Sequence, residues 1–111
     1  MADEAYIVAL QRVIGELHGC PSQHMGTVNV QETMAARIIW QGDVEVFLLV
    51  GHPRAVTCYA WLRKDTARRR RFFAVLGTAI VKTPLDAVKF AHMLSTGPLI
   101  DEFSKLVEGH R

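Results

Sequence analysis

The stretch from residue 37 to residue 50, RIIWQGDVEVFLLV, constrains the fold of this chain more than any other segment. Every even position in it is apolar or glycine, and a period of two places such residues on one side of an extended strand. Gly42 and Asp43 lie inside this pattern without shifting it, so they indicate a bend or bulge rather than a turn. The chain therefore has to fold around at least one long β-strand. The even positions are Ile38, Trp40, Gly42, Val44, Val46, Leu48 and Val50.

Three other segments have the composition of strands. Residues 27–33 alternate between valine and polar residues, and residues 55–63 and 71–81 are rich in β-branched and aromatic side chains. The links between neighbouring strands are short, and short links join antiparallel strands. The sequence therefore predicts an antiparallel meander of about four strands.

Helical periodicity occurs near the two ends of the chain. Residues 4–18 repeat apolar side chains at helical spacing between Asp3, a good N-cap, and Gly19, a good stop. Residues 84–94 begin with Pro84 after the N-cap candidate Thr83, and residues 99–108 suggest a further short helix. The predicted fold is one α+β domain over residues 1–111: a helix, the meander, then one or two C-terminal helices, in two layers.

Composition and charge narrow the class of protein. No apolar stretch approaches the ~20 residues of a membrane-spanning helix, and the acidic start MADEAYIV does not resemble a signal peptide. With only Cys20 and Cys58, this indicates a cytoplasmic protein with reduced thiols and no membrane partner. Residues 54–89 carry nine basic and two acidic side chains, whereas residues 1–53 carry two and six. Such an asymmetric field can attract an anionic partner or a second copy of the chain.

Apolar side chains are too abundant for a sheet with one solvated face. Odd and even positions of the three central strand segments are both rich in them, and few helices are available to cover two faces. An exposed apolar face favours self-association, although the C-terminal segment could cover that face instead. The leading interpretation is thus a non-catalytic binding or assembly module, homodimeric through the sheet face or its edge. The candidate contact residues are Phe47, Leu49, Tyr59, Trp61 and Phe73.

The arginine run RRRR at 68–71 supports an alternative function. Guanidinium groups bind phosphate through paired hydrogen bonds, and sheet aromatics could stack bases beside them. The run could equally be a solvated hairpin tip, which is the usual role of a charged turn. The alternative is therefore a nucleic-acid-binding module. Its candidate phosphate-binding residues are Arg63, Lys64, Arg68, Arg69, Arg70 and Arg71.

Catalytic and metal-binding patterns are weak. His18, Cys20 and His24 lie within seven residues, but no second cluster would complete four ligands, so we expect neither a metal nor another cofactor. Asp43 and Glu45 share a strand face, where a basic neighbour across the sheet is the simplest partner. A small enzyme with a pocket that the sequence does not reveal is the second alternative.

Overall fold

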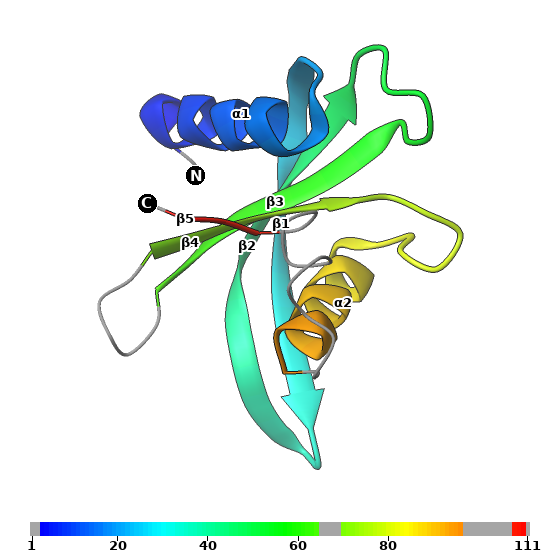
Figure 1. Ribbon diagram of the computed structural model, residues 1–111. Helices are drawn as coiled ribbons and strands as arrows, with labels where there is room; N and C mark the ends of the chain where they lie inside the picture. The colour runs from blue at the N-terminus through cyan, green and yellow to red at the C-terminus, as the bar shows by residue number, and fades with distance from the viewer. Residues whose placement is uncertain (1–2, 65–69, 97–107, 111) are drawn as a thin grey trace.

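The structure, a computed structural model, describes residues 3–64, 70–96 and 108–110 (Figure 1). The α+β class and the order of helix, four-stranded antiparallel meander and helix are confirmed. A short fifth strand, which the sequence did not predict, pairs with the edge of the fourth. The helix predicted over 99–108 falls mostly outside the described residues. The elements are α1 (Glu4–His18), β1 (Ser22–Met34), β2 (Arg37–Leu49), β3 (Thr57–Lys64), β4 (Arg70–Leu76), α2 (Pro84–Thr96) and β5 (Glu108–His110).

Both long helices begin as the sequence predicts. The Asp3 side chain accepts a hydrogen bond from the Ala5 N–H at 3.1 Å, and α1 ends at Gly19, whose φ of 71° suits glycine. At the start of α2, the Thr83 hydroxyl accepts from the Asp86 N–H while the Asp86 carboxylate accepts from the Thr83 N–H. This reciprocal arrangement is a capping box, and it fixes where the helix starts.

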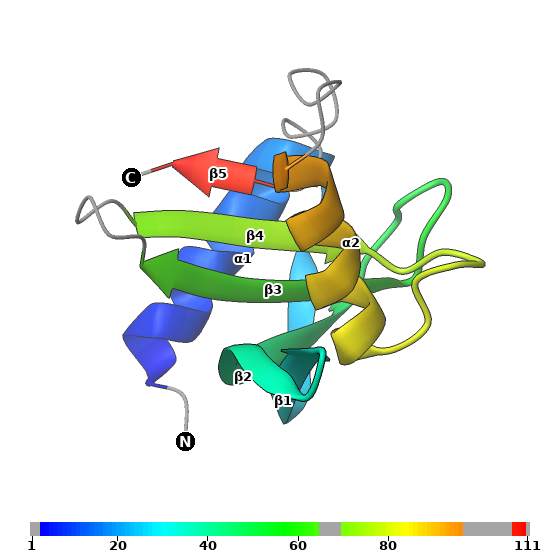
Figure 2. The ribbon, with the colours of Figure 1, turned by 90° about the horizontal axis from the view of Figure 1, so that it is seen from below.

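The two helices pack against opposite faces of the sheet, α1 on one face and α2 on the other (Figures 1 and 2). The core under α1 contains small and aromatic residues of β2, β3 and β4, and the core under α2 contains the residues that alternate with them. The α1 side includes Leu10, Val13, Ile14, Cys20, Phe47, Leu49, Cys58, Ala60, Phe72 and Ala74. The α2 side includes Val30, Val44, Tyr59, Trp61, Phe73, Val75, Val81, Ala87, Val88 and Ala91.

The register between β2 and β3 corrects the prediction that the five candidate contact residues share one face of the sheet. Val46 pairs with Tyr59, so an even residue of β2 shares a face with an odd residue of β3. Phe47 and Leu49 consequently lie on the α1 side, while Tyr59, Trp61 and Phe73 lie on the α2 side. The connection between the two strands sets this offset, and a period of two within each strand cannot reveal it.

The β1–β2 hairpin extends beyond the rest of the sheet (Figure 1). β2 pairs with β3 only from Glu45 to Leu48, whereas β1 and β2 stay paired to the turn at residues 35–36. We call residues 28–44 the arm. Its turn places Ala35 at φ 50° and Ala36 at φ 64°, in the left-handed region that alanine avoids.

Two strand ends differ most from the prediction. β1 begins at Ser22 rather than at residue 27, because residues 22–26 pair with β2 although they lack apolar alternation. β4 ends at Leu76 rather than at residue 81, because the Thr78 hydroxyl accepts from the Val81 N–H and closes a turn. That turn directs Val81 into the core under α2.

Candidate assembly edge and buried carboxylates

All five residues predicted as dimer contacts are buried within the chain. Phe47 and Leu49 lie under α1, and Tyr59, Trp61 and Phe73 lie under α2. Their burial follows from the placement of the helices, because each face of the sheet has its own helix. The interpretation of a bare apolar face is therefore wrong for the described chain, and any contact between copies has to use a different surface.

The arginine run is only partly described. Arg68 and Arg69 lie outside the described residues, and only the backbone positions of Lys64 and Arg70, paired across β3 and β4, are known. Arg63 pairs with Arg71, and both are half-buried. Phosphate binding by these residues stays a prediction.

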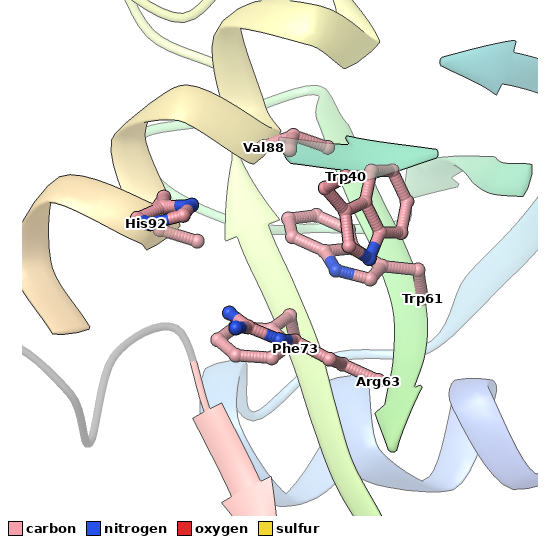
Figure 3. A pocket seen from close by; sticks show the side chains of 7 residues that line it. Trp40, Trp61, Arg63, Phe73, Val88 and His92 are labelled. Atoms are coloured by element: carbon pink, nitrogen blue, oxygen red, sulfur yellow. The ribbon is translucent and has the colours of Figure 1, made fainter. Parts of the chain in front are cut away.

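The aromatic residues that would stack nucleic-acid bases are not on an open platform. Trp61 stacks on Phe73 with ring centroids 5.2 Å apart, and Trp40 lies 6.2 Å from Trp61. Figure 3 shows these rings beside Arg63, with Val88 and His92 of α2 on the other side of the space. The enclosed volume is about 10 Å³, which is space for about one water molecule. This part of the described structure is a packed core.

The side chains of the segment HGCPSQH have separate partners. His18 donates from Nε2 to the carbonyl oxygen of Ala74 at 2.7 Å, and burial lowers the pKa of its imidazole. Cys20 and Cys58 are both buried and form no disulfide, and burial raises the pKa of the Cys58 thiol. The described residues contain no cluster of three potential metal ligands.

Glu45 is the most deeply buried charged residue of the described chain, with 0 % of its surface exposed. Its Oε1 atom accepts hydrogen bonds from His24 Nε2 at 2.8 Å and from the Thr27 hydroxyl at 2.5 Å. Its Oε2 atom is buried without a hydrogen-bond partner. A buried carboxylate needs such partners to offset its lost hydration, so Glu45 depends on these two residues of β1.

A β-bulge explains how β1 supplies both partners. His24 pairs with Phe47 and Gly26 with Val46, which leaves Met25 as the extra residue. His24 and Thr27 are separated by the two residues Met25 and Gly26, and in a regular strand their side chains would point to opposite faces. The bulge turns both towards Glu45, so this irregularity of β1 anchors the strand to the sheet.

A neighbouring hydrogen bond lies where the arm leaves the rest of the sheet, which we call the body. The Leu62 N–H donates to the Tyr6 hydroxyl at 2.9 Å, at a level of β3 where β2 is no longer paired. Burial raises the pKa of Tyr6, and the nearby carboxylate of Glu45 raises it further. Tyr6 therefore stays neutral, and its hydroxyl accepts the hydrogen bond that the Leu62 N–H would otherwise donate to a neighbouring strand.

A second glutamate, Glu32, lies on the other face. It is buried on the arm under α2, with Oε1 3.3 Å from Nδ1 of His92. Neither glutamate–histidine contact could be predicted from local sequence patterns, because one depends on the bulge and the other on where α2 docks. For Glu45 the sequence did hold an indication, since it interrupts an apolar run between Val44 and Val46.

The outer edge of β1 is one of the two edges of the described sheet. In the sheet order β1-β2-β3-β4-β5, β1 has a strand neighbour on one side only. Natural edge strands are protected by lysine, arginine or proline, and the 13 residues of β1 contain none of these. Its acidic residue, Glu32, is buried, and its histidine, His24, contacts Glu45. The protective features that remain are the bulge at Met25, a second irregularity of the β1–β2 pairing between Glu32 and Thr33, and the Gln11 side chain of α1, which donates to the Ser22 carbonyl at 3.0 Å.

Apolar side chains accompany this open edge. Met25, Val28 and Met34 of β1 expose 59 %, 41 % and 65 % of their surface. Ile38 and Ile39 of β2 are exposed next to the turn at the end of the arm. These residues lie along the arm and the bulged end of β1, whereas the large apolar residues of the central strands β3 and β4 are buried or half-buried.

Comparisons with protein-family models, with curated proteins and with solved structures find no match to this chain. Within the described residues, no helix has the length and apolar character needed to span a membrane. The function therefore has to be inferred from the geometry of the chain itself.

Proposed function

We propose that this chain is a non-catalytic assembly module in which β1 pairs with β1 of a second copy, forming one continuous sheet across a two-fold axis. The observation that carries the proposal is the 13-residue edge strand without a single lysine, arginine or proline. An edge of this length offers a row of backbone N–H and C=O groups that can pair with another strand.

A second copy is a suitable partner because of symmetry. Two identical strands related by a two-fold axis run antiparallel, so each can satisfy the backbone groups of the other. Like charges opposite each other would oppose this pairing, but the exposed side chains of β1 are uncharged. Only the residue at the two-fold axis faces its own copy, and the exposed Asn29, Gln31 and Thr33 would meet uncharged exposed side chains of the other β1 without repulsion.

Burial of apolar surface supports the same arrangement. Val28 and Met34 lie on the pairing strand and are largely exposed in the single chain. Fully burying a side chain of this size contributes roughly 1.5–3 kcal/mol, so partial burial of a few of them in each copy gives a useful driving force. The two buried, unpaired cysteines also suit the reducing environment of the cytoplasm, where we expect the module to act.

The test is the mass in solution of two matched variants. Gln31 and Gln41 are directly paired, exposed residues on the same face of the arm, one on β1 and the other on β2. We expect the wild-type chain to sediment as a dimer, Gln31→Lys to shift to monomer and Gln41→Lys to remain dimeric. A monomeric wild type at high concentration, or equal effects of both lysines, would contradict pairing through the β1 edge.

A further inference from the structure

We propose that a cleft between the β2–β3 and β4–α2 connections binds a small organic anion with a compact apolar body, such as a phosphate monoester. The cleft has a volume of about 450 Å³, within the ~300–1,000 Å³ of small-molecule sites. It lies where β3 begins and β4 ends, and in Figures 1 and 2 both connections project from this end of the sheet. Its lining includes Arg54, Thr57, Tyr59, Thr78, Val81 and Lys82.

One wall of the cleft is the connection from Val50 to Val56, and its backbone is held by specific hydrogen bonds. Nδ1 of His52 accepts from the N–H groups of Arg54 and Ala55, both at 3.0 Å. The Leu49 N–H donates to the Val56 carbonyl at 2.7 Å and closes the loop. Arg54 is thus attached to an ordered backbone, which lowers the entropic cost of binding a ligand.

The opposite wall, residues 77–82, is ordered in a similar way. The Thr78 N–H donates to the Val81 carbonyl at 3.0 Å, and the Val81 N–H donates to the Thr78 hydroxyl at 3.1 Å. The Tyr59 hydroxyl donates to the Lys82 carbonyl at 3.0 Å and connects this wall to the sheet. The cleft is therefore formed before any ligand binds.

Gly77 lies at the junction of the two walls. Its N–H donates to the Thr57 carbonyl at 2.8 Å. A Cβ added at Gly77 would lie 3.3 Å from both Cβ and the carbonyl oxygen of Thr57, which is tighter than ordinary contact. The absence of a side chain here lets the two walls approach each other closely.

The charges of the cleft favour an anion. Arg54 and Lys82 both line it, and none of the lining residues is acidic. The nearest acidic residue in the sequence, Asp86, uses its carboxylate to accept from the N–H groups of Lys82 and Thr83, which also lowers its pKa. Val56, which is 66 % exposed, supplies apolar lining for the body of the ligand, and the largely buried Tyr59 and Val81 form the floor beside it.

The test is an NMR titration of the full chain with phenyl phosphate, with phenol as the uncharged probe. We expect saturable shifts at Thr57, Gly77 and Thr78 with phenyl phosphate and none with phenol. Arg54→Gln and Lys82→Gln should each weaken binding at least about tenfold, the loss expected for a hydrogen bond to a charged group. Lys89→Gln removes an exposed charge of α2 outside the cleft and should bind like the wild type.

Three outcomes would overturn the proposal. They are no saturable shift with phenyl phosphate, phenol binding as tightly as phenyl phosphate, or equal weakening by Lys89→Gln and Arg54→Gln. Thermal melting of each variant checks that it is folded. Because Arg54 and Lys82 lie outside β1, these results are independent of the mass measurements that test assembly.

Discussion

The body of the sheet and its arm share β1 and β2 but are stabilised in different ways. In the body, β3 and β4 lie between two helices, and their large side chains are buried on both faces. In the arm, α2 covers one face, while Asn29, Gln31, Gln41 and Asp43 line the other and are exposed to water. The difference indicates that the body provides stability, whereas the arm leaves backbone groups and apolar side chains exposed, which is the surface that the proposed assembly would use.

The largest expected effect is a difference between the body and the arm in how much a truncated side chain lowers the free energy of unfolding. Phe47→Ala should lower the free energy of unfolding by about 3–5 kcal/mol, because Phe47 is fully buried in the body and its loss leaves a cavity. Trp40→Ala in the arm should cost less, since Trp40 is half-exposed. Urea denaturation measures both values. A larger loss for Trp40 would show that the arm contributes more stability than the body.

The next effect concerns the anchor that joins β1 to the body. His24→Ala removes a hydrogen-bond donor from a carboxylate that has no access to water, and should cost about 1–3 kcal/mol. Gln23→Ala, at the exposed neighbouring position, should change stability by no more than ~0.5 kcal/mol. If His24→Ala and Gln23→Ala have the same melting temperature, the contact between His24 and Glu45 does not anchor the strand.

The smallest effect is a gain in stability at the end of the arm. Ala36→Gly should stabilise the chain by about 1 kcal/mol, because glycine adopts the positive φ of this turn without the steric cost that alanine has. Ala79→Gly, in a connection where no positive φ occurs, is the control and should not stabilise. Denaturation midpoints measure the difference. A loss of stability in Ala36→Gly would mean that the alanine turn is not strained.

Local patterns in the sequence were sufficient to predict α1, α2 and the meander, because they depend on neighbouring residues. Asp3 and Gly19 limit α1, and Thr83 with Pro84 starts α2, as capping preferences predict. The order of the strands followed from short links. These features need no knowledge of how distant segments pack.

The candidate site could be predicted only in part. The offset between β2 and β3, seen in the pairing of Val46 with Tyr59, depends on the loop between them and determined which residues share a face. The position of α2 on the second face depends on tertiary packing, and it buries the aromatic residues once expected to be exposed. The missing lysine, arginine and proline in β1 were visible in the sequence, but their meaning requires knowing that β1 is an edge strand.

The most direct test of pairing through β1 is amide hydrogen exchange measured as a function of protein concentration. In a single chain, the N–H groups on the outer edge of β1 have no strand partner, so they should exchange quickly in dilute solution. Pairing with a second copy predicts that protection within residues 22–34 increases with concentration, while the amides of Gly51, His52 and Arg54 stay unchanged. If a dimer forms and the amides of β1 exchange equally fast at every concentration, the two copies associate through another surface and the account of the edge is wrong.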